Sequence, residues 1–148
     1  MASAVPGQLT LDLTLSEKTI RHARRIAMES VGMWGYDDVA HDVAVVVAEL
    51  LTNVFQHADA PKGGTDKRAR LVVQVLVSLP SAGRLVVVVH DDDPAIPKER
   101  CADETAVSGR GLALVRGLTD SLAFVPAEGG KDLVAVFSLE ADREEAAA

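Results

Sequence analysis

The sequence predicts an α+β fold, a two-layer sandwich in which helices cover one face of a mixed, mostly antiparallel sheet. The main observation is the order of the patterns along the chain: strand, helix, helix, strand, strand, loop, helix, strand, strand. Such grouping is typical of helices segregated on one face of a sheet, whereas a doubly wound parallel sheet alternates regularly. Composition agrees, because 48% hydrophobic and 25% charged residues are the balance of a folded globule.

The first half of the chain predicts one strand and two helices. Residues 9–15 (LTLDLTL) alternate apolar and polar side chains, which is typical of a half-buried edge strand. Ser16 is a suitable N-cap for a helix over residues 17–32. A longer helix is expected over residues 37–59, and Pro61 follows its end.

The second half predicts a hairpin, a helix and a second hairpin. Residues 69–79 and 84–91 are apolar runs that flank the turn sequence PSAG, so they should pair antiparallel. After a loop over residues 94–108, the sequence GLALVRGLTD has helical spacing and is preceded by glycines. Residues 121–139 then predict two strands joined by a glycine turn.

Length and charge limit the number of domains and the classes of binding partner that we expect. We expect one domain over residues 9–140 of the 148, with flexible ends at 1–8 and 141–148. A net charge of -7 disfavours direct binding to nucleic acid or to an anionic membrane. The single cysteine, Cys101, excludes an internal disulfide and a four-cysteine zinc site. With no signal peptide or long apolar run, we expect a cytoplasmic protein.

The long helix has two different sides. Its polar stripe consists of Glu49, Asn53 and His57, spaced i, i+4 and i+8. The stripe is either the solvated face of an amphipathic helix or the wall of a partly buried site, and its valine neighbours favour a site. An asparagine oxygen suits Mg²⁺, and a glutamate can act as a general base. The apolar arc opposite is Val43, Val46, Val47, Leu50, Leu51, Val54 and Phe55.

Three carboxylates directly follow a run of valines in VVVVHDDDPAIP, residues 86–97. Such crowding of negative charge suggests a use: a metal, a phosphoryl group or the amine of a purine base. The run resembles the acidic pair of phospho-acceptor receiver domains. There, however, the pair follows the first strand, whereas here 84 residues precede Leu85 and the downstream order differs. The receiver fold is therefore rejected.

Three motifs resemble the GHKL ATPase and kinase superfamily. AELLTNVFQHA (48–58) resembles its N box, HDDDPAIP (90–97) its first glycine box and SGRGLALV (108–115) its second glycine box, in the family's order. The resemblance extends over about residues 10–140. Within the superfamily, the small bacterial anti-sigma-factor serine kinases are the most similar branch. The resemblance implies ATP and Mg²⁺ as cofactors.

At the base end, the resemblance implies that Asp91 accepts a hydrogen bond from the exocyclic amine of adenine, since a carboxylate is an acceptor without a donor. Asp93 and Ala95 stand where the family usually has glycines. Aspartate tolerates the left-handed region, so Asp93 is expected to keep the turn. Asp132 replaces a hydroxyl that commonly reaches the adenine pocket.

At the phosphate end, the resemblance implies that Asn53 coordinates Mg²⁺ and that Glu49 is the general base. His57 is either a phosphate contact or a member of a polar network. The second glycine box is expected to precede a helix and to offer its amides to the phosphate chain. The residues so assigned are Gly109, Arg110, Gly111 and Leu112.

Two functions follow from the resemblance. The first is a serine/threonine protein kinase that phosphorylates an anti-sigma-factor antagonist and also binds a sigma factor; Glu49 and Asn53 support it. The alternative is a non-catalytic module that regulates transcription by protein contact alone, which the departures at Asp93, Ala95 and Asp132 support. Members of this family often pair, so a homodimer is possible, although no sequence feature predicts its interface.

Overall fold

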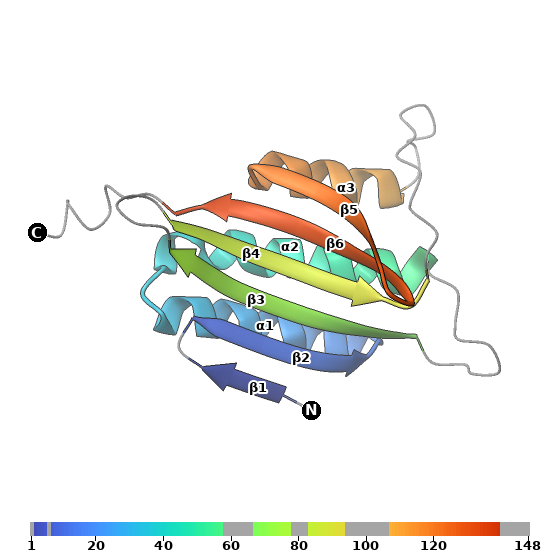
Figure 1. The fold of residues 1–148 in the computed structure, drawn as a ribbon, viewed down its shortest axis with the longest axis horizontal. Helices are drawn as coiled ribbons and strands as arrows, with labels where there is room; N and C mark the ends of the chain where they lie inside the picture. The colour runs from blue at the N-terminus through green and yellow to red at the C-terminus, as the bar shows by residue number, and fades with distance from the viewer. Residues whose placement is uncertain (1, 6, 58–66, 78–82, 94–106, 140–148) are drawn as a thin grey trace, which may run out of the picture.

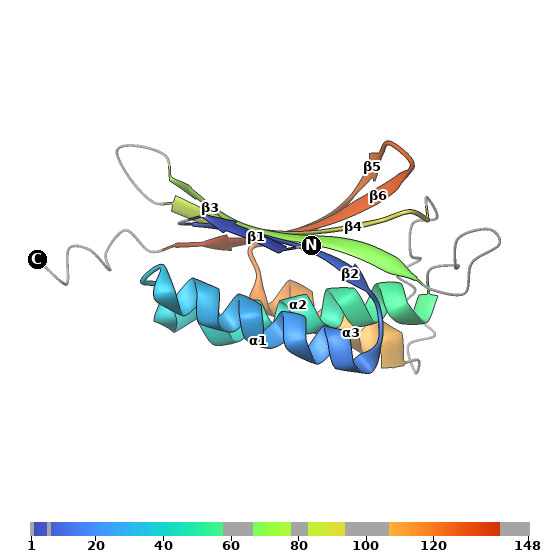
Figure 2. The same ribbon diagram turned by 90° about the horizontal axis from the view of Figure 1, so that it is seen from below.

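The computed structural model describes residues 2–5, 7–57, 67–77, 83–93 and 107–139. Its strands form one six-stranded sheet in the order β1-β2-β3-β4-β6-β5, and every neighbouring pair is antiparallel. The helices lie on one face of this sheet, and the other face is open (Figures 1 and 2). The predicted α+β sandwich is confirmed, with a described sheet that is antiparallel throughout. The elements are β1 (Ala2–Val5), β2 (Gln8–Thr14), α1 (Glu17–Met33), α2 (Asp37–His57), β3 (Arg68–Val77), β4 (Gly83–Asp91), α3 (Val107–Leu118), β5 (Ser121–Ala127) and β6 (Gly130–Ser138).

The first helix begins where its capping residues predict. The Ser16 side chain accepts a hydrogen bond from the Thr19 backbone N–H at 3.0 Å, and the Ser16 N–H donates to the Thr19 hydroxyl at 2.9 Å. This reciprocal capping box satisfies backbone donors that a helix start leaves without partners. The predicted start of α1 is therefore confirmed.

The core lies between α2 and the middle strands. Figure 1 shows α2 between α1 and α3. The apolar arc of α2 is buried as predicted, except for Phe55, which is only partly buried. The sheet supplies alternate residues of each strand, because successive side chains of a strand point to opposite faces. Those on the inner face of the central strands include Leu71, Val73, Leu85, Val87, Val89, Leu133 and Ala135.

The N-terminus differs from the prediction. Residues 2–5, expected to be flexible, form β1, which pairs with β2 from Ala2↔Leu11 to Val5↔Gln8. The strand β2 is therefore not an edge strand, because β1 covers its outer side. Gly7 has φ 80°, a value that glycine adopts without steric cost and that permits the short turn between the strands.

The other end of the predicted domain is untested, because residues 140–148 lie outside the described residues. Within the described ranges, no helix is both long enough and apolar enough to span a bilayer.

Candidate functional site

The polar stripe of α2 runs from a buried to an exposed environment. Asn53 is buried, with 8% of its surface exposed, and Glu49 is partly buried. His57, the last residue of α2, is exposed. The prediction that the stripe faces a partly buried space is thus confirmed for Asn53 and Glu49, whereas His57 lies on the solvated part of the stripe.

The helix α3 begins earlier than predicted. It starts at Val107, so Gly109, Arg110 and Gly111 lie within its first turns and do not precede it. Each glycine disfavours a helix by about 1 kcal/mol relative to alanine, so the local sequence does not predict a helix at these positions. Burial of Leu112 and Val115 against the core offsets this cost. Leu112, predicted as a ligand contact, therefore has a packing side chain.

The start of α3 lies against the polar stripe of α2. A Cβ atom at Gly111 would lie 2.8 Å from Oε2 of Glu49, so the glutamate carboxylate occupies the space that a larger residue would need. The first amides of a helix have no acceptor within it, and that of Gly109 is among them. The Glu49 carboxylate and the first turns of α3 are thus brought together at one place.

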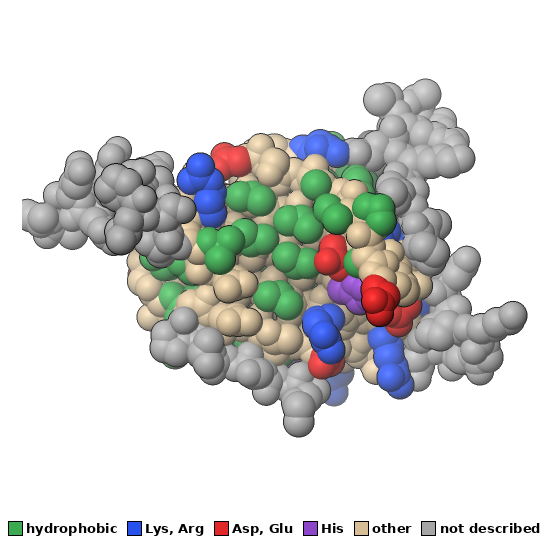
Figure 3. Space-filling model, in the orientation of Figure 1, with side chains coloured by type: hydrophobic (Ala, Val, Ile, Leu, Met, Phe, Trp, Pro, Cys, Tyr) green, Lys and Arg blue, Asp and Glu red, His purple; other side chains and the backbone are tan. Residues whose placement is uncertain are grey.

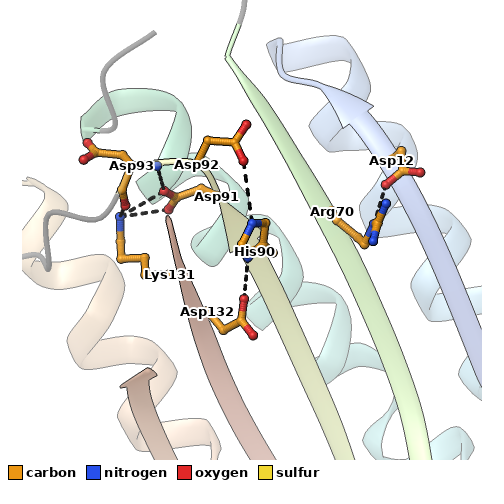
Figure 4. A network of polar contacts seen from close by, with 8 residues as sticks. All are labelled: Asp12, Arg70, His90, Asp91, Asp92, Asp93, Lys131 and Asp132. Carbon is orange, nitrogen blue, oxygen red and sulfur yellow. Dashed lines mark hydrogen bonds and ion pairs between the residues drawn. The ribbon is translucent and has the colours of Figure 1, made fainter. Parts of the chain in front are cut away.

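Asp91 ends β4 and points toward the helices. It follows the buried residues Val87 and Val89 on the inner face of the strand, and only 2% of its surface is exposed. Its Oδ1 accepts a hydrogen bond from the Asp93 backbone N–H at 2.7 Å (Figure 4). Asp91 is therefore a buried carboxylate at the end of β4, on the side of the sheet that faces the helices.

Lys131, which the sequence analysis does not assign to the site, forms a buried ion pair with Asp91. Its Nζ lies 2.9 Å from Oδ2 of Asp91 and donates to Oδ1 at 3.1 Å. It also donates to the Asp93 carbonyl oxygen at 2.8 Å. Lys131 is only 4% exposed. The sequence indicates that Lys131 is buried, since it lies two residues before the buried Leu133 on the same face of the strand. Its contact with Asp91 does not follow from the local sequence, because it depends on β6 pairing with β4.

The turn after β4 is held differently from the prediction. Among the described residues, only glycines have positive φ, so the expectation that Asp93 adopts a left-handed conformation is wrong. The hydrogen bonds of the Asp93 backbone to Asp91 and Lys131 hold the turn instead. Ala95 lies outside the described residues.

Gly130 allows β6 to approach the end of β4 closely. A Cβ atom there would lie 1.9 Å from the backbone oxygen of Asp91 and 2.8 Å from Cα of Asp92. Both contacts are with backbone, which cannot move aside as a side chain can. Glycine at position 130 is therefore required by the approach that places Lys131 beside Asp91.

Asp132 lies on the opposite face of the sheet from Asp91, so the prediction that position 132 faces the adenine pocket is wrong. Its Oδ1 lies 2.6 Å from Nδ1 of His90, and Nε2 of His90 lies 3.6 Å from Oδ1 of Asp92. Figure 4 shows this cluster on the open face, and Asp92 is solvated, with 67% of its side chain exposed. Position 131, one residue earlier, lies on the same face of the sheet as Asp91.

The open face also has a polar hollow next to this cluster. Hydrophobic side chains gather over the middle of that face, and charged groups gather near the end of β4 (Figure 3). A cavity of about 620 Å³ lies there, and none of Glu49, Asn53 and Asp91 lines it. It is lined by Asp12, Leu13, Thr14, Arg68, Ala69, Arg70, His90 and Asp92.

One ion pair at this hollow shifts the titration of its members. Arg70 Nε donates to Oδ1 of Asp12 at 2.7 Å, and this hydrogen bond holds the pKa of Asp12 below its ordinary value. The same bond raises the pKa of Arg70. Both side chains are largely exposed, at 47% and 60%.

On the helix side of the sheet, Asp91 and Asn53 fit the ATP and Mg²⁺ that the sequence motifs imply. Oδ2 of Asp91 is buried and has no hydrogen bond of good geometry, so it can still accept one from the amine of a base. The described residues contain no cluster of three or more His, Cys, Asp or Glu that could hold a metal by itself. Any Mg²⁺ would therefore depend on the Asn53 oxygen together with phosphate oxygens.

Comparisons with known proteins agree with the fold. A family model described as a histidine kinase-like ATPase domain matches residues 13–137. No curated protein matches significantly. One similar structure contains the RsbU and RsbW domains of Rv1364c from Mycobacterium tuberculosis, at 19% identity and TM-score 0.50, covering 88% of this chain and 32% of that one. Another is a blue-light activated histidine kinase domain from Erythrobacter litoralis, at 19% identity and TM-score 0.45, covering 86% and 63%. The chain thus spans less than two thirds of either protein.

Proposed function

Because the chain belongs to the histidine kinase-like ATPase domain family, we propose that it is an ATP-binding regulator that phosphorylates a serine or threonine of a partner protein. The main support is the position of Glu49, whose carboxylate lies against the first turns of α3 on the same side of α2 as the buried Asn53. This arrangement supports a general base, an amide oxygen and the backbone amides at the start of α3 around one space.

At the base end of the site, Asp91 would accept the hydrogen bond of the adenine amine through Oδ2. A buried carboxylate that lacks a well-formed hydrogen bond at one oxygen gains from such a donor. Guanine presents a carbonyl at the equivalent position, and two acceptors repel each other. The proposal therefore includes a preference for adenine nucleotides.

At the phosphate end, the amides at the start of α3 would bind the phosphate chain, and the positive end of the helix dipole favours its negative charge. Asn53 would coordinate Mg²⁺, which when bound neutralises phosphate charge. No acidic side chain is needed next to Asn53 for this, since phosphate oxygens complete the coordination.

Glu49 would act on the hydroxyl of the partner protein. As the hydroxyl oxygen bonds to the γ-phosphorus, the bond from that phosphorus to the β-phosphate oxygen breaks and ADP leaves. Glu49 takes the hydroxyl proton. Its partial burial and its place beside α3 suit a base that must lie within reach of the transferred group.

The partner class is the finer part of the proposal. The motifs resemble those of anti-sigma-factor serine kinases, and one similar structure includes an RsbW domain. We therefore extend the proposal to a cytoplasmic regulator whose partners are an anti-sigma-factor antagonist and a sigma factor.

A second candidate is a non-catalytic module that acts through protein contact alone. One observation favours it: the ammonium group of Lys131 already pairs with both carboxylate oxygens of Asp91. A base-reading carboxylate that is occupied by an internal cation binds nucleotide less well.

Phosphate transfer from radiolabelled ATP to a candidate antagonist protein, in the presence of MgCl₂, tests the two candidates. Glu49→Gln keeps the shape of the side chain and removes the base, so the initial rate should fall by about 10²–10⁴-fold. Glu29→Gln, an exposed position on α1, is the matched control and should transfer at the wild-type rate. Equal rates for wild type and Glu49→Gln, or no transfer at all, would contradict the kinase and leave the non-catalytic module.

A further inference from the structure

The Lys131 ammonium group has a complete set of acceptors inside the protein. Three oxygens surround Nζ: Oδ1 of Asp91 at 3.1 Å, Oδ2 of Asp91 at 2.9 Å and the Asp93 carbonyl oxygen at 2.8 Å. Oδ1 of Asp91 and the Asp93 carbonyl accept hydrogen bonds from Nζ, and Oδ2 of Asp91 is in ion-pair contact with it. Both partners are almost fully buried, at 4% and 2% exposure, so water does not weaken the pair.

We propose that Lys131 determines the nucleotide affinity and base selectivity of this chain by competing with the base for Asp91. Asp91 is already paired with Lys131 of the same chain. Adenine must therefore bind to a carboxylate that has the Lys131 ammonium group beside it. The proposal rests on the proposed function only in taking Asp91 as the group that contacts the base.

The competition favours Lys131 for two reasons. A hydrogen bond from a charged donor is roughly twice as strong as one from a neutral amine, so exchange of the ammonium group for adenine is unfavourable. Displaced Lys131 would also leave the carbonyl of Asp93, and a buried polar group that loses its partner is costly. Adenine is therefore bound weakly, and the preference for adenine over guanine is reduced.

The geometry also indicates how the competition is relieved. Oδ2 of Asp91 lies close to Nζ but in poor hydrogen-bonding geometry, so it is the oxygen that a base can reach first. A shorter residue at position 131 frees this oxygen, and an uncharged donor there competes with the base less strongly than the ammonium group does. Neighbouring residues need not move, because Gly130 and the register of β6 against β4 remain the same.

Titration calorimetry of ATP and GTP against wild type and three variants tests the proposal. Lys131→Thr removes the charge and opens space, Lys131→Gln keeps a neutral donor without the charge, and Lys131→Arg keeps the charge. We expect Thr and Gln to tighten ATP binding by about tenfold, close to the difference between a charged and a neutral hydrogen bond. The ratio of ATP to GTP affinity should rise with it, and Arg should bind like wild type.

Controls separate folding from binding. Circular dichroism and thermal melting establish that each variant is folded, and Lys131→Gln serves if the Thr variant fails to fold, because it still donates to Asp91. Lys67→Gln removes another partly buried lysine, which donates to the Phe55 carbonyl oxygen, and should leave ATP affinity unchanged.

The outcomes distinguish this inference from the proposed function. Tighter ATP binding by the Thr and Gln variants supports the inference, whether or not wild type binds measurably. If wild type binds ATP and these variants match it within twofold, the inference is overturned and the proposed function stands. If only the variants bind ATP, the inference stands and the native chain is the non-catalytic module. If no variant binds ATP, both are overturned.

Discussion

Two pairs that each contain a carboxylate lie one residue apart on the same two strands and face opposite ways. In the β4–β6 register, Asp91 pairs with Lys131, and the preceding residue His90 pairs with Asp132. Asp91 and Lys131 face the helices, with 2% and 4% of their side chains exposed. His90 and Asp132 face the open side, with 30% and 32% exposed. Figure 4 shows both pairs.

The difference teaches that environment, more than pairing chemistry, sets what such a pair does. A buried pair has lost the hydration of both charges, so removal of one member leaves a charge without compensation. A pair on the open face remains hydrated, and removal of one member costs little. The loss of one member is therefore expected to cost more stability in the inner pair than in the outer pair.

The largest effect is expected from breaking the inner pair. Asp91→Ala leaves the Lys131 ammonium group buried without its carboxylate, and the free energy of unfolding should fall by about 3–5 kcal/mol. Urea unfolding measures this. The double variant Asp91→Leu with Lys131→Met should regain most of the loss, because it removes both charges. A loss below about 1 kcal/mol for Asp91→Ala would mean that the pair is not buried as described.

The next effect concerns the glycine that brings the inner pair together. Gly130→Ala places a methyl group against the backbone of Asp91 and should cost about 3 kcal/mol, since the strand itself must shift. Gly117→Ala in α3 is the control: no atom lies within 4 Å of its added Cβ, so it should stabilise by about 0.5–1 kcal/mol. Equal effects of the two substitutions on the urea midpoint would contradict the close approach.

Breaking the outer pair of His90 and Asp132 should lower the free energy of unfolding less than Asp91→Ala or Gly130→Ala does. Asp132→Asn removes the charge next to His90 on the open face and should change the free energy of unfolding by about 0.5 kcal/mol. The same urea experiment measures it. A cost comparable to that of Asp91→Ala would remove the contrast between the two faces.

The smallest effect is expected at the exposed pair of Asp12 and Arg70, and it depends on pH. The pKa of Asp12 is lowered in the folded state by the hydrogen bond from Arg70. The resulting stability is present above the ordinary value of 3.8 and is lost as the pH falls through the lower folded value. Arg70→Gln should therefore lower the urea midpoint slightly near neutral pH and leave it unchanged in strong acid. A larger effect in acid would contradict this sign.

Most of the fold could be predicted because its signals are local. The cap at Ser16, the apolar arc of α2 and the valine run of β4 each need only neighbouring residues. The local sequence does not predict β1, because ASAV has no strong alternation of apolar and polar residues. These residues form a strand only by pairing with β2. The start of α3 was misplaced because its glycines disfavour a helix locally, whereas burial of its apolar side determines the outcome.

The positions of the candidate site residues could be predicted only where they follow from residue spacing within one helix or one strand. Glu49 and Asn53 are one turn apart on a helix, and Asp91 follows directly from the alternation of β4. Lys131 is 40 residues from Asp91 in sequence, so their contact depends on which strands pair and in which register. Asp132, which the resemblance places at the adenine pocket, lies on the other face from Asp91 because successive residues of a strand alternate between the two faces.

A crystal structure of the chain with ADP and MgCl₂ tests the central claim most directly. The account predicts that the adenine amine contacts the Asp91 carboxylate and that the phosphates lie between the start of α3 and Asn53. Nucleotide bound instead in the open-face hollow beside Arg68 and Arg70, with the pair of Lys131 and Asp91 intact, would contradict it.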